Sequence, residues 1–365
     1  MTLVLLATAG GSCGRAERVA EPARPVAVGA LVPLTGPGSE MGPKTREGFL
    51  LYWERNPSLL GRSVRPLVDD NKGNPRDGLA AFYAIKARGG DDLVLLLTQL
   101  SGVAAAIAPN TTSAKFIQFG MAASPALLKY PWNYRTYASA ARIGEKLATA
   151  PAIASNVNRI YILAMADEYA RAVADAFKAA AAKNRLDVVG EDLFPADATD
   201  TTGVVQKALA AKPDAIVVTG FGRSPVSCIR RLRELGFKGA IFGDPAAAYK
   251  PYTKMIGDAA EGLYVVDLDF PSDNPVGSAA TFRRAFLKKY NREPDLGNVL
   301  SYASLEIFAE AVRRAKSVDP VALAPVLDAG FTVETALGTA HLTGRDTQFP
   351  LVLKVVRNGE ARRVE

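Results

Sequence analysis

From Pro25 onward the chain alternates short runs of β-branched and large apolar residues with longer helical patterns. Nine of these runs are predicted as strands, at 26–33, 63–69, 93–98, 115–119, 159–164, 188–194, 215–219, 240–242 and 262–266. They are short and largely apolar, which is typical of strands buried on both faces. Alternation of strands and helices of this kind indicates parallel sheets covered by helices, so the fold class is α/β.

Three helix starts are marked by a capping side chain directly before a proline, at Asn74-Pro75, Ser224-Pro225 and Asp319-Pro320. The helix after Pro225 carries an apolar stripe at Val226, Ile229, Leu232 and Leu235, and Gly236 is expected to end it. A second stripe repeats every four residues at Phe282, Phe286 and Tyr290. Both stripes are interpreted as core-facing surfaces.

The chain of 365 residues exceeds the size at which a single core stops growing, so two sheets are expected rather than one. The segments 133–137 and 269–277 are the expected crossing points between them. The net charge of +7 comes from basic residues spread over the wet faces of several helices, without interleaved aromatic residues, so we expect no nucleic-acid partner.

The sequence offers little material for catalysis or metal binding. His341 is the only histidine and lies in a predicted strand or turn, where we expect a surface or structural role. Cys228 is expected to be a small core residue of a helix. A Walker loop and a GxGxxG motif are both absent. No metal, cofactor or catalytic residue is therefore expected.

Residues 1–25 have the pattern of an export leader followed by a tether. An apolar run and small residues precede Cys13, as in proteins whose cysteine is modified with lipid. The run has no leading Lys or Arg, and Gly10 stands where lipoprotein signals usually have leucine, so a plain leader or a truncated start is the alternative. No other stretch reaches the roughly 20 apolar residues of a membrane-spanning helix.

The predicted strands end in loops that expose backbone and lead toward helices, where open α/β sheets bind ligands. In the first loop, GALVPLTGPGSEMG, Gly36 and Gly38 allow a sharp turn and a close approach to a ligand, and a helix is expected from Ser39. The alternative is that these glycines only shape the turn. In TQLSGVAAAIAP, Ser101 at a helix start can hold a carboxylate together with the free N–H of Gly102, or it can serve only as an N-cap.

In order and spacing, seven segments resemble the type I periplasmic solute-binding proteins of branched-chain amino acid (Leu/Ile/Val) ABC transporters. They are VGALVPLTGPGSEMG, DDNKGNP, SGVAAAIAP, KALAAKPDAIVVTGFG, RELGFKGAIFGD, GDAAEGLYVV and FLKKYNREPD, spread from about residue 26 to the end. The resemblance implies two Rossmann-like lobes with parallel sheets, joined by a three-strand hinge and closing on a small ligand. The expected N-terminal lobe is 26–137 plus 272–341, and the C-terminal lobe is 138–271 plus 342–365.

The resemblance also implies ligand-binding residues. Ser101 matches the serine that binds the ligand carboxylate, although Thr98 and Gln99 stand where the family usually has Gly-Pro. Asp244 stands where an acidic residue pairs with the ligand ammonium, and a buried charge there needs such a partner. The other expected site residues are Gly102, Met121, Ala123, Tyr169, Phe221 and Met41.

Several of these positions depart from the family pattern. Ala123 replaces a threonine, so only its backbone can act. Met41 and Phe221 each replace an aromatic residue, which is often tyrosine at the second position, and Ala170 replaces the glycine that usually follows Tyr169. These changes favour a ligand with an apolar or aromatic body, or a carboxylate without an amino group, whereas Asp244 favours a ligand with an ammonium.

The expected function is that of an extracytoplasmic solute-binding protein that delivers an amino acid-like ligand to ABC permease subunits. Two alternatives from other classes are considered. The first is a ligand-sensing receptor domain for a small carboxylate or amide. The second is an enzyme on the same scaffold that uses Asp167, Asp244 and Tyr169, but no recognised catalytic motif supports it.

Overall fold

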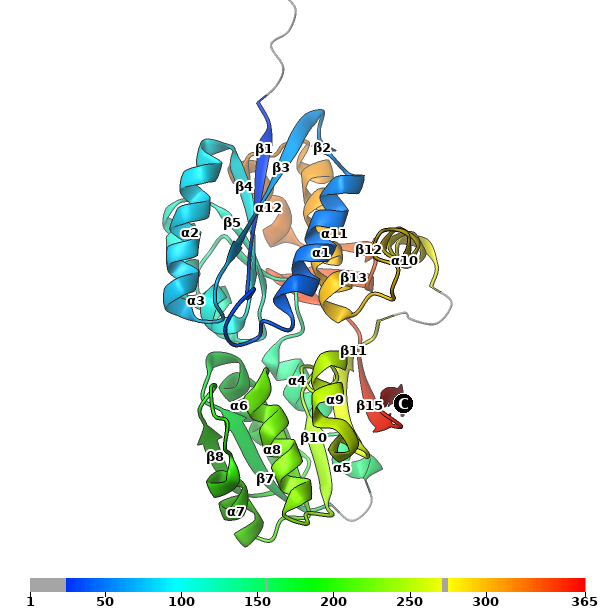
Figure 1. Ribbon diagram of the computed structural model, residues 1–365. Coiled ribbons are helices and arrows are strands. Elements are labelled where there is room, and N and C mark those ends of the chain that lie inside the picture. The colour runs from blue at the N-terminus through cyan, green and yellow to red at the C-terminus, as the bar shows by residue number, and fades with distance from the viewer. Residues whose placement is uncertain (1–23, 155–156, 271–274, 365) are drawn as a thin grey trace, which may run out of the picture.

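The computed structural model describes residues 24–154, 157–270 and 275–364, which form two lobes with one sheet each (Figure 1). The first sheet has the order β12 (Phe331–Thr335), β13 (Gly338–Thr343), β14 (Asp346–Gln348), β6 (Asn133–Arg135), β5 (Ile117–Met121), β4 (Leu93–Gln99), β1 (Val26–Val32), β3 (Arg62–Asp70), β2 (Ser58–Leu59). The second has the order β16 (Glu360–Arg363), β15 (Leu351–Arg357), β11 (Leu263–Leu268), β10 (Ala240–Gly243), β9 (Ala215–Thr219), β7 (Arg159–Met165), β8 (Asp187–Phe194). The predicted α/β fold with two parallel-dominated sheets is confirmed.

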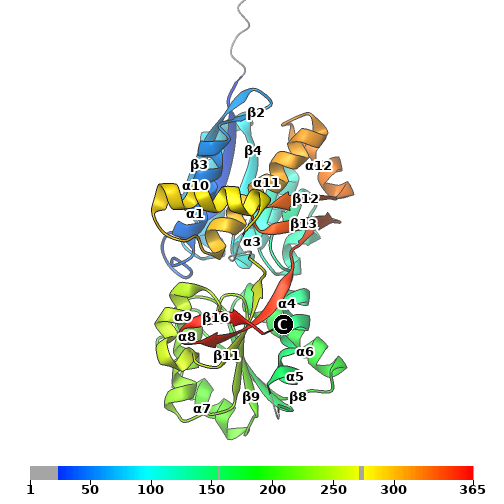
Figure 2. The same ribbon diagram turned by 90° about the vertical axis from the view of Figure 1, so that its right-hand side faces the viewer.

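Helices cover both faces of each sheet. In the first lobe, α2 (Pro75–Gly89) and α3 (Ser101–Ser113) lie on one side, and α1 (Gly42–Arg55) and α11 (Leu296–Ala315) lie on the other (Figure 1). In the second lobe, α4 (Ala140–Leu147), α5 (Ala150–Ile153) and α6 (Glu168–Lys183) lie opposite α7 (Thr202–Ala210), α8 (Arg223–Glu234) and α9 (Lys250–Ile256) (Figure 2). Helices α10 (Gly277–Tyr290) and α12 (Pro320–Ala329) complete the first lobe. Every residue of β1 and β4 is buried, as expected for strands between two helical layers.

The two sheets share one topology at their centres. Strand β1 pairs in parallel with β3 on one side and β4 on the other, and β7 pairs in parallel with β8 and β9 in the same way. Successive strands are added on one side of β1 and then on its other side, and the same holds at β7. These switch points leave a crevice at the carboxyl ends of the two strands. Figure 1 shows the two lobes meeting at these ends.

The edges of the sheets differ from the sequence expectation because they are antiparallel. Strands β12, β13 and β14 pair antiparallel in the first sheet, and β15 pairs antiparallel with β11 and β16 in the second. The expected lobe boundary between 341 and 342 therefore falls inside β13. It is wrong because Leu342 pairs with Phe331 within the first lobe and β14 joins β6, so the chain crosses at 349–350 instead.

The nine predicted strands are all present, with ends that differ by at most two residues. The largest shift is in β5, which begins at Ile117 rather than at Lys115. Lys115 has a φ of 50° and makes a left-handed turn after α3, so it cannot extend the strand.

Two of the three predicted helix caps are confirmed. The Asn74 side chain accepts a hydrogen bond from Asp77 N, and the Asp319 side chain accepts one from Val321 N. Ser224 is not a cap, because α8 already begins at Arg223 and the Ser224 hydroxyl donates to Ala196 O.

Three further details concern helix ends. Helix α1 begins at Gly42 rather than at Ser39, because residues 39–41 form a turn. Gly236 has the predicted left-handed conformation with a φ of 87°. Leu235 is 39% exposed and so lies outside the buried stripe to which it was assigned, beyond the last residue of α8.

Cys228 is buried in α8, and burial raises the pKa of its thiol to about 12, which confirms the prediction of a core residue. His341 is exposed on β13, with its Nδ1 2.9 Å from Thr332 Oγ1. No cluster of residues that could hold a metal ion occurs in the described part of the chain.

The expected leader and Cys13 lie outside the described residues, as do residues 271–274 of the crossing segment 269–277. Among the helices that the structure describes, none has the length and apolar character needed to cross a membrane.

Candidate ligand-binding site

A small cavity of about 80 Å³ lies between the two lobes. The first lobe contributes Met41, Gln99, Leu100, Ser101, Met121, Ala123, Leu296, Gly297 and Leu300, the second contributes Tyr169, Phe221, Pro245, Ala246 and Tyr249, and Tyr137 comes from a crossing segment. Most of these side chains are apolar, and none carries a positive charge. Small-molecule sites typically have this character, with a few polar groups that fix orientation.

The cavity lies where the two switch points face each other. In the first lobe its residues follow the ends of β1, β4 and β5, and in the second they follow β7, β9 and β10. Loops that follow equivalent strands of the two lobes therefore line opposite sides of the cavity. This placement agrees with the rule that open α/β sheets bind ligands at the carboxyl ends of strands beside the switch point.

Ser101 is the first residue of α3, and its hydroxyl faces the loop after β5. Its Oγ accepts hydrogen bonds from Ala123 N at 3.1 Å and from Ser124 N at 3.3 Å. The hydroxyl hydrogen is then left to donate to a ligand. The alternative that Ser101 is only an N-cap is wrong, since Leu100 occupies the cap position and the Ser101 side chain makes no capping bond.

Asp244 follows β10 and is completely buried. Its carboxylate accepts hydrogen bonds from Gly220 N at 2.8 Å and from Ala246 N at 2.9 Å. Burial raises the pKa of Asp244 to about 7, and these backbone hydrogen bonds only partly oppose the shift. The carboxyl group itself does not line the cavity, although its neighbours Pro245 and Ala246 do.

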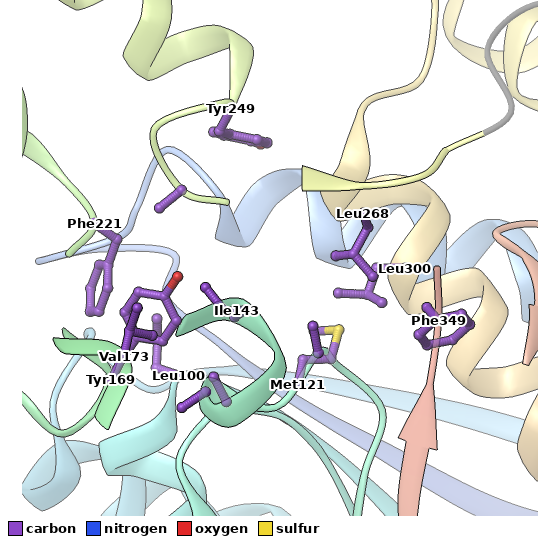
Figure 3. Packing of buried hydrophobic residues seen from close by; sticks show 14 of the residues in the cluster. Leu100, Met121, Ile143, Tyr169, Val173, Phe221, Tyr249, Leu268, Leu300 and Phe349 are labelled. Atoms are coloured by element: carbon purple, nitrogen blue, oxygen red, sulfur yellow. The ribbon is translucent and has the colours of Figure 1, made fainter. Parts of the chain in front are cut away.

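Two aromatic rings form the wall on the side of the second lobe. The ring centroids of Tyr169 and Phe221 are 6.0 Å apart, with an interplanar angle of 58°. Figure 3 shows these rings side by side, and it also shows Tyr249, Leu300 and Met121. The Tyr169 hydroxyl is buried and lies beside the carboxyl group of Asp244. Burial, followed by the nearby charge of Asp244, raises the pKa of Tyr169 well above its usual value, so the hydroxyl stays protonated.

Polar contacts across the lobes hold the cavity closed. Glu40 of the first lobe accepts hydrogen bonds through its carboxylate from Arg223 Nε and from the Tyr252 hydroxyl, each at 3.3 Å. The Tyr249 hydroxyl donates to the backbone oxygen of Glu40, also at 3.3 Å. On another part of the interface, the Ser124 hydroxyl donates to Glu168. The conformation is therefore one in which the two lobes are in contact.

The loop after β1 turns sharply at two glycines. Gly36 has a φ of 71°, and a Cβ atom there would lie 2.4 Å from Lys72 O. Gly38 has a φ of 84°, and a Cβ there would lie 3.5 Å from ring carbons of Phe221 in the other lobe. Neither glycine lines the cavity between the lobes, so their close approaches are to Lys72 and to the facing lobe.

The carboxylate of Asp70 holds the same loop through hydrogen bonds. It accepts them from the N–H groups of Leu34 and Lys72, each at 2.8 Å, and from the Thr35 hydroxyl. Burial opposes ionisation, but these hydrogen bonds outweigh it and lower the pKa of Asp70. The loop that carries Met41 to the cavity is therefore held by a charged anchor.

A larger open hollow of about 510 Å³ lies beside this loop, and its lining includes Glu40, Arg223, Arg230 and Arg231. Its walls carry several exposed charges, in contrast to the apolar cavity. We assign the ligand site to the smaller, apolar cavity between the lobes, because burial of a small ligand requires a concave and largely apolar surface.

Six of the eight predicted site residues line the cavity, namely Ser101, Met121, Ala123, Tyr169, Phe221 and Met41. Gly102 and Asp244 do not. Sequence reasoning missed the wall formed by Tyr137, Tyr249 and the first turns of α11. Tyr249 follows the predicted strand 240–242, but nothing in the sequence shows that its ring reaches the cavity, and α11 follows no predicted parallel strand. Sequence reasoning also missed the side chain of Gln99, whose only signal was its departure from the Gly-Pro pattern.

Comparisons with known proteins agree with this architecture. The model of the periplasmic binding protein family matches residues 25–358. The chain is 24% identical over 321 residues to Leu/Ile/Val-binding protein homolog 3 of Brucella melitensis, with 86% of each chain covered.

Two solved structures have the same fold. The leucine-binding protein LivK of Thermotoga maritima has a TM-score of 0.86 and 22% identity, covering 93% of this chain and 98% of that one. A solute-binding protein of an ABC transporter from Rhodopseudomonas palustris BisB5, in complex with 3,4-dihydroxybenzoic acid, has a TM-score of 0.82 and 20% identity, covering 93% and 96%. With two lobes of type I topology and a family match over nearly its whole described length, the chain belongs to the periplasmic binding protein family.

Proposed function

We propose that the protein is an extracytoplasmic solute-binding protein of an ABC transporter and that it binds a small amino acid with an apolar or aromatic side chain. The observation that carries this proposal is the apolar cavity built by both lobes, with a hydroxyl donor at Ser101 on one side and the buried carboxyl of Asp244 behind the other. A ligand that touches both lobes stabilises the closed form over the open one.

The ligand carboxylate is assigned to the start of α3. Ser101 donates its hydroxyl hydrogen there, and the first N–H groups of the helix, including that of Gly102, have no acceptor within the helix. The dipole of α3 adds partial positive charge at this end, so a carboxylate can be held without a basic side chain.

The ligand ammonium is assigned to Asp244. This carboxyl group is buried and has no cationic partner among the groups that shift its pKa, so an ammonium would supply the missing positive charge. Met41, Met121, Tyr169 and Phe221 then surround the ligand side chain, and Ala123 contributes only its backbone.

A second candidate ligand is an aromatic carboxylate that lacks an amine. It is favoured by the position of Asp244 behind the cavity wall and by its raised pKa, which allows a neutral carboxyl group near neutral pH. A structural neighbour from Rhodopseudomonas palustris, which shares the fold, was solved with 3,4-dihydroxybenzoic acid.

We further propose that permease subunits of the transporter receive the ligand and that Cys13 carries a lipid anchor. The apolar run and small residues before Cys13 support the anchor. Mass spectrometry of the protein purified from its native membrane fraction tests it, because a lipid-modified Cys13 would add a diacylglycerol mass to a shortened chain.

The ligand assignment is tested by mass spectrometry of the molecule released on unfolding, followed by calorimetric titration of apolar and aromatic amino acids and of benzoates. We expect an L-amino acid to bind wild type and Ser101→Ala to weaken that binding at least tenfold, the usual effect of losing a hydrogen bond to a charged group. Ser113→Ala, at the exposed other end of α3, is the matched control and should leave binding unchanged. Equal affinities for the two variants would contradict the site.

A further inference from the structure

Gln99, the last residue of β4, places its side chain in the cavity wall with only 9% of its surface exposed. Its Oε1 atom is buried and has no hydrogen-bond partner among the described residues. A buried acceptor that has lost its water without gaining a donor destabilises the folded protein. Such a group at the edge of a cavity indicates that its partner arrives with the ligand.

Gln118 on the neighbouring strand β5 shows the difference between this side chain and a structural glutamine. The Gln118 Nε2 group donates to Thr98 Oγ1 at 2.9 Å and to Ala104 O at 3.0 Å, and its Oε1 lies 3.4 Å from Thr111 Oγ1. The two amide hydrogens of Gln118 are thus satisfied by the protein alone, and its Oε1 lies near a hydroxyl, whereas Gln99 Oε1 has no partner among the described residues.

The backbone at Gln99 is held in place independently of its side chain. Asn71 is fully buried, and its Nδ2 group donates to Gln99 O and to Leu31 O, each at 3.1 Å. These bonds tie together the ends of β4 and β1, which border the switch point. Gln99 therefore lines the cavity from a fixed base, as a residue that recognises a ligand must do.

We propose that Gln99 Oε1 accepts a hydrogen bond from the donor on the α-carbon of the ligand, so that the site selects α-amino and α-hydroxy acids over unsubstituted acids. This rests on the proposed function, which places the ligand carboxylate at Ser101. Gln99 and Ser101 lie two residues apart and both line the cavity. A ligand whose carboxylate is bound at Ser101 therefore has the substituent of its α-carbon near the Gln99 carboxamide. An unsubstituted acid leaves Oε1 buried without a donor and loses affinity.

The test uses Gln99→Met, which keeps the unbranched shape and removes the acceptor. Calorimetry measures the dissociation constants of L-leucine, (S)-2-hydroxy-4-methylpentanoate and 4-methylpentanoate, and of L-phenylalanine with its hydroxy and unsubstituted counterparts. We expect wild type to bind the α-hydroxy acid about tenfold more tightly than the unsubstituted acid, and Gln99→Met to reduce this ratio to about twofold or less. The hydroxy acid makes the comparison specific, because it carries no ammonium for Asp244.

Equal weakening of all three members of a series by Gln99→Met would overturn the inference and leave the proposed function intact. Failure of both series to bind wild type would instead refute the amino acid assignment itself, together with the inference that rests on it. A thermal melt of the ligand-free variant adds an independent readout. Gln99→Met should melt at or above the wild-type temperature, and a melting temperature several degrees lower would show a structural role instead.

Discussion

The pKa of Asp244 leads to a quantitative prediction for ligand binding. Burial raises this pKa to about 7 in the ligand-free protein, so about 10% of Asp244 is ionised at pH 6 and about 90% at pH 8. An α-ammonium pairs with the ionised form, and its affinity should follow that fraction. We therefore expect the dissociation constant of an α-amino acid to fall about tenfold between pH 6 and pH 8.

No group around Asp244 is expected to titrate between pH 6 and pH 8 in a way that cancels the predicted change in ligand affinity. Burial raises the pKa values of Tyr169 and Tyr137 far above it. Asp267, which is also buried, accepts a hydrogen bond from Lys354 at 2.7 Å. Burial raises the pKa of Asp167, the cap of α6, to about 6. The Asp167 side chain accepts a hydrogen bond from Ala170 N. The variant Asp167→Asn is therefore the control for its titration, and it should keep the pH dependence of ligand binding.

The assay is calorimetric titration at pH 6, 7 and 8 in buffers with different heats of ionisation. At pH 6 the complex should release about 0.9 proton per ligand, because binding ionises Asp244. Asp244→Asn should bind weakly with no pH dependence over the same range. An affinity that stays constant from pH 6 to pH 8, or a pH dependence that persists in Asp244→Asn, would refute the pairing. For a carboxylate without an amine the sign reverses, and affinity should fall about tenfold as pH rises through 7.

Further predictions concern closure, the first loop and stability. Glu40→Ala removes two side-chain contacts across the lobes, so it should weaken ligand binding about fivefold and raise the radius of gyration of the ligand-free protein in X-ray scattering. The control Glu54→Ala removes an ion pair within one lobe and should change neither quantity. Gly36→Ala should cost at least about 2 kcal/mol more in urea unfolding than Gly61→Ala, since both have positive φ but only Gly36 would clash with Lys72 O; equal costs would contradict this. Burial raises the pKa of Glu306 to about 7 in the folded protein, so the folded state favours the protonated carboxyl group. Its contribution to stability is complete below about pH 4, near the pKa of a glutamate in the unfolded chain, and is lost as the pH rises to about 7. Urea unfolding should accordingly show the advantage of wild type over Glu306→Gln shrinking from pH 4 to pH 7, and a constant advantage would be inconsistent with the raised pKa.

Much of the fold was predictable because each buried strand is a short apolar run and each flanking helix carries local signals. The Asn74 and Asp319 caps act within one helical turn, so the sequence alone identifies them. The strand ends then located the loops that bear Ser101, Tyr169 and Phe221. Local signals failed at Ser224, where the hydroxyl bonds to Ala196 in a separate loop rather than to its own helix.

The remaining features depend on contacts between distant parts of the chain. Leu296 and Leu300 belong to α11 and reach the cavity only because that helix packs on the first sheet beside α1. Leu342 belongs to the first lobe because it pairs with Phe331, which no local pattern indicates. The unsatisfied Oε1 of Gln99 is likewise visible only once the surrounding atoms are placed.

A crystal structure of the complex with the amino acid that binds most tightly in the titrations tests the assigned site. We expect the ligand inside the cavity between the lobes, with its carboxylate at Ser101, its ammonium at Asp244 and its side chain among Met121, Tyr169 and Phe221. A ligand bound in the open hollow beside Arg223, or one that contacts only a single lobe, would contradict it.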